Sequence, residues 1–164
     1  DPGLRESFMT RVCTYHDWKK LVAGGVSAKA LIEFYTRYKY LAMAHHVPSY
    51  KQLGRMLANA GREPLDELAD TFISTLMAAL AVRATRRSHS NVLHHIAGYL
   101  KSRIPAEQRQ RLAELIDDYR VGQVPLIVPV TMIRHHFADN PDAYIDNQAF
   151  LQPYPEELRL RNLV

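Results

Sequence analysis

Cysteine is almost absent from this chain of 164 residues, and its scarcity narrows the possible chemistry. The single cysteine, Cys13, cannot form a disulfide within the chain, which fits a reducing cytoplasm. It lies in an apolar helical pattern, so we expect a buried structural thiol and not a nucleophile. Cys13 also has no second cysteine with which to share a zinc ion.

Long apolar runs and several common motifs are missing as well. No run reaches the roughly 18 apolar residues that a membrane span requires, and no signal peptide is visible. We therefore expect a soluble, cytoplasmic protein without a membrane partner. Neither a glycine-rich phosphate loop nor a dinucleotide fingerprint occurs. The chain begins with Asp1-Pro2 and not with methionine, which suggests a fragment of something longer.

Helical periodicity is what the sequence does contain, with start and stop signals along the whole chain. Asp1 and Pro2 open a first helix that Gly24-Gly25 ends. Its expected inward face comprises Leu4, Phe8, Val12, Tyr15 and Val22. Further helices are expected to start at Ser27, Ser49, Pro64, Pro105, Pro129 and Asn140. No strand-like alternation or linker interrupts this pattern, so residues 1–164 are predicted to form one all-α domain, a bundle of seven or eight helices.

The polar density is highest in residues 83–101, which we expect to form the central helix. The helix from Pro64 either runs unbroken into this stretch or pauses near Ser88. At 100° per residue, the apolar arc holds His89, Val92, Leu93, Ile96, Tyr99 and Leu100. The opposite arc holds Arg87, Asn91, His94, Gly98 and Lys101. His89 is most simply a buried histidine with its hydrogen bonds satisfied.

The outer arc favours binding of phosphate or nucleotide. The chain has 21 Lys and Arg against 17 Asp and Glu, a net charge of +4 that weakly favours polyanionic partners. Guanidinium groups match phosphate oxygens, Asn91 and His94 suit a base edge, and tyrosines stack on bases. The candidate ligand-binding residues are Arg37, Lys39, Arg87, Asn91, His94, Tyr99, Lys101 and Tyr154. The alternative is a solvated helix face, and binding requires Arg37 and Lys39 to converge on the same side.

Three adjacent histidine pairs suggest a different chemistry. They are His45-His46, His94-His95 and His135-His136. Neighbours on a helix point about 100° apart, so each pair can aim only one ring at a shared centre. A metal site from His45, His94 and His136 would support a metal-assisted hydrolase. The other interpretation is capping, because imidazoles near helix C-termini can bind free carbonyl groups.

Several short motifs together resemble a known family. They are Leu4-Arg5-Glu6-Ser7-Phe8, Phe34-Tyr35-Thr36-Arg37-Tyr38-Lys39, Ala84-Thr85, His89-Ser90-Asn91-Val92-Leu93, Gly98-Tyr99, Tyr119-Arg120-Val121-Gly122, Pro125-Leu126, Gln148 and Leu151-Gln152-Pro153-Tyr154-Pro155. In this order they are similar to the YbgA-like family of bacteria and archaea, a domain of unknown function. The resemblance covers nearly the whole chain. Tyr35 and Tyr38 stand where the family favours histidines, which weakens any metal site that needs those positions.

The resemblance implies an accessory role. In that family the domain occurs alone or behind a cysteine-rich domain resembling thiouracil desulfidases, which use an iron-sulfur cluster. We therefore expect a nucleotide- or RNA-binding domain that presents substrate to a desulfidase-like partner, in the same chain or separate, and holds no cofactor itself. The alternatives are the hydrolase above and a structural dimerisation or docking domain, for which residues 152–155 would suit the surface.

Overall fold

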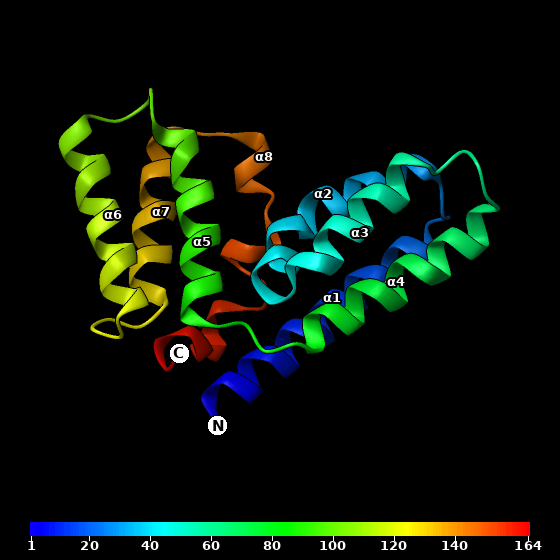
Figure 1. Cartoon of the computed structure of the whole chain (residues 1–164), viewed down its shortest axis with the longest axis horizontal. Coiled ribbons are helices and arrows are strands. Elements are labelled where there is room, and N and C mark those ends of the chain that lie inside the picture. The colour runs from blue at the N-terminus through cyan, green and yellow to red at the C-terminus, as the bar shows by residue number, and fades with distance from the viewer.

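The computed structural model describes all of residues 1–164 and is entirely helical, which confirms the all-α prediction (Figure 1). Its eight α-helices are α1 (Pro2–Ala23), α2 (Ala28–His45), α3 (Val47–Ala58), α4 (Leu65–Ala81), α5 (Arg86–Ala97), α6 (Ala106–Arg120), α7 (Ile127–Asp139) and α8 (Ala143–Asp146). Four short 3₁₀ helices accompany them: η1 (Gly98–Leu100), η2 (Ala149–Leu151), η3 (Glu156–Leu158) and η4 (Leu160–Asn162).

Most helix starts follow the capping signals in the sequence. The Asp1 carboxylate accepts hydrogen bonds from the backbone N–H groups of Gly3 and Leu4, and Ser27 caps α2. Three expected starts were wrong by two or three residues. The N-cap of α8 is Asp142 and not Asn140. Helix α3 begins at Val47 because His46, not Ser49, is its N-cap. Helix α7 begins at Ile127, so Pro129 lies in its first turn, where a proline needs no hydrogen-bond donor.

The helices form two groups that meet at an angle. Figure 1 shows α1 to α4 on one side and α5 to α7 on the other, with both chain termini at one end of the molecule. Helix α2 packs against α5 and η2, so it joins the groups. The buried apolar side chains form one continuous cluster, from Trp18 and Phe72 in the first group to Ile116 and Ile133 in the second. A shared core makes the chain one domain.

A break between α4 and α5 decides the question that the sequence left open. Helix α4 ends at Ala81, and α5 begins at Arg86. Thr85 and Ser88 form a capping box, in which each side chain binds the backbone N–H of the other residue. This cap starts a new helix, so α4 does not continue into the central stretch.

The expected inward face of α1 was wrong. Its apolar residues are 43% to 63% exposed: Leu4, Phe8, Val12, Tyr15 and Val22. The buried residues of α1 are instead Glu6, Thr10, Thr14 and Trp18. This face meets partners distant in the sequence: Trp18 packs against Phe72 of α4, and Arg161 and Tyr154 donate to the Glu6 carboxylate. Periodicity within one helix cannot reveal such a distant partner.

Two further expectations concern exposure. No helix of the structure has both the length and the apolar character needed to cross a bilayer. Cys13, expected to be buried, is only partly so. Burial followed by the charge of Asp17 raises the pKa of its thiol, which makes it a poor nucleophile.

Candidate nucleotide-binding surface

The two arcs predicted for the central helix are present in α5. Val92, Leu93 and Ile96 are fully buried. The opposite residues are all exposed: Arg87, Asn91, His94, Gly98 and Lys101. We call these five residues the outer face. Tyr99, expected on the buried arc, is 40% exposed because α5 ends at Ala97 and a 3₁₀ turn rotates the following side chains differently.

The outer face offers hydrogen-bond donors that the protein itself does not use. The side chains of Arg87, Asn91 and Lys101 take part in no ion pair or hydrogen bond within the chain. His94 lies 3.5 Å from Asp117 on α6, measured from Nε2 to Oδ1, and both side chains are well exposed. An exposed pair of this kind is weak and can be displaced by a ligand. The outer face can therefore bind an anionic partner at little cost.

A cluster of aromatic rings lies at the C-terminal end of the outer face. The rings of Tyr99 and Tyr144 have centroids 5.6 Å apart. The Lys39 ammonium lies 5.5 Å from the Tyr144 centroid and 5.6 Å from that of Tyr40, within range of cation–π attraction. We call these four residues the tyrosine cluster. Lys39 and Tyr99, both predicted from the sequence, are thus brought together, through two tyrosines that the sequence analysis missed.

The electrostatics of the tyrosine cluster keep Lys39 charged. Partial burial by itself lowers the pKa of Lys39, but the hydroxyl of Tyr144 and the neighbouring tyrosines outweigh it, and the pKa is raised. Burial is also the main cause that raises the pKa of the Tyr40 hydroxyl. At neutral pH the cluster therefore presents one cation among neutral aromatic rings.

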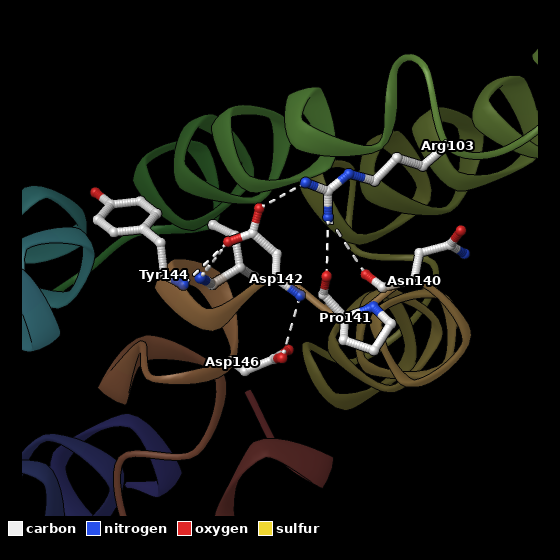
Figure 2. Close-up of polar contacts among 7 residues, drawn as sticks. Arg103, Asn140, Pro141, Asp142, Tyr144 and Asp146 are labelled. Atoms are coloured by element: carbon white, nitrogen blue, oxygen red, sulfur yellow. Dashed lines mark hydrogen bonds and ion pairs between the residues drawn. The ribbon is translucent and has the colours of Figure 1, made fainter.

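A polar network fixes Tyr144 in this cluster (Figure 2). Arg103, which follows η1, donates to the Asp142 carboxylate over 2.9 Å and to the Pro141 carbonyl over 3.2 Å. The same carboxylate caps α8 by accepting from the backbone N–H of Tyr144 and Ile145. Because Arg103 comes from the end of the central stretch, the network ties α8 to the outer face.

Two predicted ligand-binding residues lie elsewhere. Arg37 donates to Asp17 on α1 over 2.9 Å, and it points away from Lys39, two residues further along α2. The convergence of Arg37 and Lys39, on which phosphate binding was expected to depend, is therefore not seen. Of the two residues, only Lys39 remains available, and binding at the outer face then depends on the tyrosine cluster in place of Arg37. Tyr154 is only 7% exposed, and its hydroxyl donates to Glu6, so its ring cannot stack on a ligand at the surface.

The proposed three-histidine metal site is not formed. His45 is buried at the end of α2, His94 is exposed on α5, and His136 lies on α7. No three histidine, cysteine, aspartate or glutamate side chains are grouped closely enough to hold a metal ion. His46 shows the alternative role, because its ring Nδ1 accepts from the backbone N–H of Ser49 and caps α3. His45, His94 and His136 therefore do not come together as a set of ligands.

Comparison with known proteins places the chain in a family. Residues 39–155 match the family model described as protein of unknown function, DUF1722. The chain belongs to the DUF1722 family. It is also 34% identical over 158 residues to the uncharacterized protein YbgA of Escherichia coli strain K12, a match that covers 96% of this chain and 94% of that protein. No solved structure matches the chain.

The match confirms the resemblance to YbgA-like domains of unknown function. The matched range of the DUF1722 family includes α5, η1 and α8, and therefore both the outer face and the tyrosine cluster. All of α1, the part of α2 before residue 39 and the C-terminal residues 156–164 lie outside it.

Proposed function

We propose that the chain is an accessory domain that binds RNA or nucleotides through the outer face and the tyrosine cluster. The observation that carries this proposal is the juxtaposition of Tyr99, Tyr144 and Lys39 at the end of an exposed, cationic helix face. Proteins that bind single-stranded nucleic acid combine these two elements: a positively charged surface that contacts the nucleic-acid backbone, and aromatic rings on which the bases stack.

The outer face supplies the positively charged surface that would contact the nucleic-acid backbone. Arg87 lies in the first turn of α5, and Lys101 follows η1 beyond the other end of the helix. Arg87 can bind two phosphate oxygens at once, and Lys101 adds a compact charge. Asn91 and His94 lie between them with groups that suit a base edge.

The tyrosine cluster supplies the stacking surface. Tyr99 is the exposed ring, and Tyr144 supports it from behind. A base stacked on an aromatic side chain contributes about 1 to 3 kcal/mol with little dependence on sequence. We therefore propose a preference for unpaired nucleotides, whose bases can leave their neighbours.

The proposed role is presentation of substrate to a second domain. The outer face has donors for binding but no paired carboxylates or metal-ligand group for catalysis. We propose a desulfidase-like partner, carrying the iron-sulfur cluster, and a cytoplasmic setting, because these are what the YbgA-like resemblance implies.

The exposed apolar face of α1 favours a second candidate, a docking or dimerisation domain. Five large apolar residues follow one side of α1 without covering partners in the chain, and such faces are typical of protein contacts. Sedimentation velocity of the wild type and of Phe8→Ser with Val12→Ser tests it. Loss of an oligomer in the variant supports this candidate, and a monomeric wild type contradicts dimerisation.

Binding of a labelled single-stranded RNA, followed by fluorescence anisotropy, tests the main proposal. We expect Tyr99→Ala to weaken binding roughly 5- to 100-fold, since one stacking contact is lost. Tyr99→Trp should retain affinity because the aromatic ring is kept. Equal affinity of wild type and Tyr99→Ala would contradict the proposal.

A further inference from the structure

A separate cavity of about 390 Å³ lies at the other end of α5, where its first turn meets the start of α1. Figure 1 shows this end of the molecule, where the two chain termini also lie. Its walls come from distant parts of the chain, including Glu6 of α1, His45 of α2, Arg86 and His89 of α5, and Tyr119 of α6. None of these residues belongs to the outer face or the tyrosine cluster.

Two buried histidines line the cavity, each with one free ring nitrogen. His45 and His89 are each only 6% exposed. Nδ1 of His45 lies 2.7 Å from the Val82 carbonyl oxygen, and Nδ1 of His89 lies 2.7 Å from the Tyr119 hydroxyl. In both rings Nε2 has no partner within the chain. Neither Nε2 atom is completely shielded, so both can hydrogen-bond a ligand in the cavity.

The hydrogen bonds also define what these nitrogens can do. A carbonyl oxygen only accepts, so Nδ1 of His45 carries the proton. Nε2 of a neutral His45 is then an acceptor, which requires a donor such as a hydroxyl group from the ligand. Burial lowers the pKa of both histidines, which keeps them neutral at physiological pH.

Arg83 and Arg86 line the mouth of the cavity, and the guanidinium group of each lies against a glycine. A Cβ atom on Gly3 would lie 2.8 Å from Nη2 of Arg83, and one on Gly122 would lie 2.5 Å from Nη1 of Arg86. Gly122 also has a φ of +86°, which other residues rarely adopt. Any side chain at these glycines would displace the guanidinium groups.

The start of α5 adds free backbone donors at the same mouth. The capping box satisfies the N–H groups of Thr85 and Ser88. The N–H groups of Arg86 and Arg87, the first two residues of α5, have no acceptor within the chain. Free N–H groups and the helix dipole favour an anion at this position.

The acidic groups near the cavity are already partly neutralised. Glu6 is buried, and its carboxylate accepts hydrogen bonds from Arg161 over 3.4 Å and from Tyr154 over 3.3 Å. Asp1 caps α1 and lies 3.2 Å from Arg83. Arg86 has no carboxylate partner, so its guanidinium group remains available to an anion.

We propose that this cavity binds a hydroxyl-bearing phosphate monoester, the chemistry shared by sugar phosphates and nucleoside monophosphates. The phosphate lies between Arg83, Arg86 and the free N–H groups of α5, and the organic part reaches His45 and His89. The cavity volume lies within the range usual for small-molecule sites. The proposal does not depend on RNA binding at the outer face, because it uses other residues.

Isothermal titration calorimetry with four probes tests this proposal. We expect ribose 5-phosphate or uridine 5′-monophosphate to bind, inorganic phosphate to bind at least 10-fold more weakly, and ribose not to bind. The sugar phosphate and the nucleotide distinguish the two possible sources of the monoester. Failure of both monoesters to bind the folded protein would overturn the proposal, and so would equal affinity for inorganic phosphate.

Variants locate the binding in the cavity. Arg86→Ala should weaken binding of ribose 5-phosphate at least 10-fold, while Arg87→Ala, the matched loss of the next arginine side chain, should leave it within about 2-fold. Both side chains are exposed, so both proteins should fold, as thermal melting can verify. Equal loss in the two variants would contradict the assigned site. RNA titration of the same proteins is expected to show the reverse order, so failure of one proposal is distinguishable from failure of the other.

Discussion

His89 and His94 lie five residues apart on α5 and have opposite environments. His94 is exposed beside Asp117, whereas His89 is buried against Tyr119 and Phe150. Desolvation, with smaller effects of Arg161 and His45, lowers the pKa of His89 to about 3. The sequence predicted this burial from periodicity alone. It could not predict the Tyr119 hydroxyl, because that partner is 30 residues away.

The pKa of His89 predicts acid sensitivity. The unfolded chain takes up a proton at this histidine near pH 6.5, whereas the folded protein does not until about pH 3. Stability is therefore lost as the pH falls below about 6.5, by up to about 1.4 kcal/mol per pH unit. Urea unfolding between about pH 4 and pH 7 measures how the free energy of unfolding depends on pH. This dependence should be less steep in His89→Gln, by the amount that corresponds to about one proton. An unchanged slope would show that His89 is not held neutral.

The arcs of α5 predict which substitutions affect stability. Ile96 is fully buried, so Ile96→Ala should reduce the free energy of unfolding by about 2 to 5 kcal/mol. Arg87→Ala and Asn91→Ala remove exposed, unpaired side chains and should change it by less than about 1 kcal/mol. Chemical denaturation measures the free energy of unfolding of each variant. A large loss of stability in Arg87→Ala would mean that the residue is architectural and not a ligand contact.

Among the elements, α8 shows how a short helix can support a binding surface. Its single turn could not persist alone, and it depends on the Asp142 cap and on Arg103. This arrangement holds Tyr144 in place (Figure 2), with its ring 5.6 Å from that of Tyr99.

Removal of the α8 cap should therefore reduce both stability and binding. Asp142→Ala is expected to cost about 0.5 to 2 kcal/mol, the usual value of an N-cap, and to weaken RNA binding by displacing Tyr144. Ser27→Ala removes the cap of α2 and is the matched control, with a similar cost but unchanged binding. Thermal melting and anisotropy on the same samples compare the two. Parallel binding losses in both proteins would indicate general destabilisation.

Helices were predictable from the sequence to different degrees. The caps at Asp1 and Ser27 are local and were predicted from the sequence, whereas the Thr85 cap was not identified. The orientation of α1 could not be predicted, because its buried face contacts residues distant in the sequence, including Phe72 and Arg161. Tyr144 carried no local signal either, since it joins Lys39 and Tyr99 only after α2, η1 and α8 have packed.

At the scale of the whole molecule, α5 connects two distinct features. One end carries the tyrosine cluster beside α8, and the other end opens into the histidine-lined cavity beside α1. The outer face runs between them. The shared core holds both ends in a fixed relation, because α5 packs on α2 in one helix group and on α6 in the other.

The salt dependence of RNA binding tests the central claim most directly. The slope of log affinity against log salt concentration changes by about 0.7 for each phosphate contact to a single strand. Arg87→Ala and Lys101→Ala should each make the slope shallower by about that amount, whereas Arg55→Ala, an equal charge loss on α3, should leave it unchanged. A wild-type affinity that does not vary with salt, or equal changes in all three variants, would contradict RNA binding at the outer face.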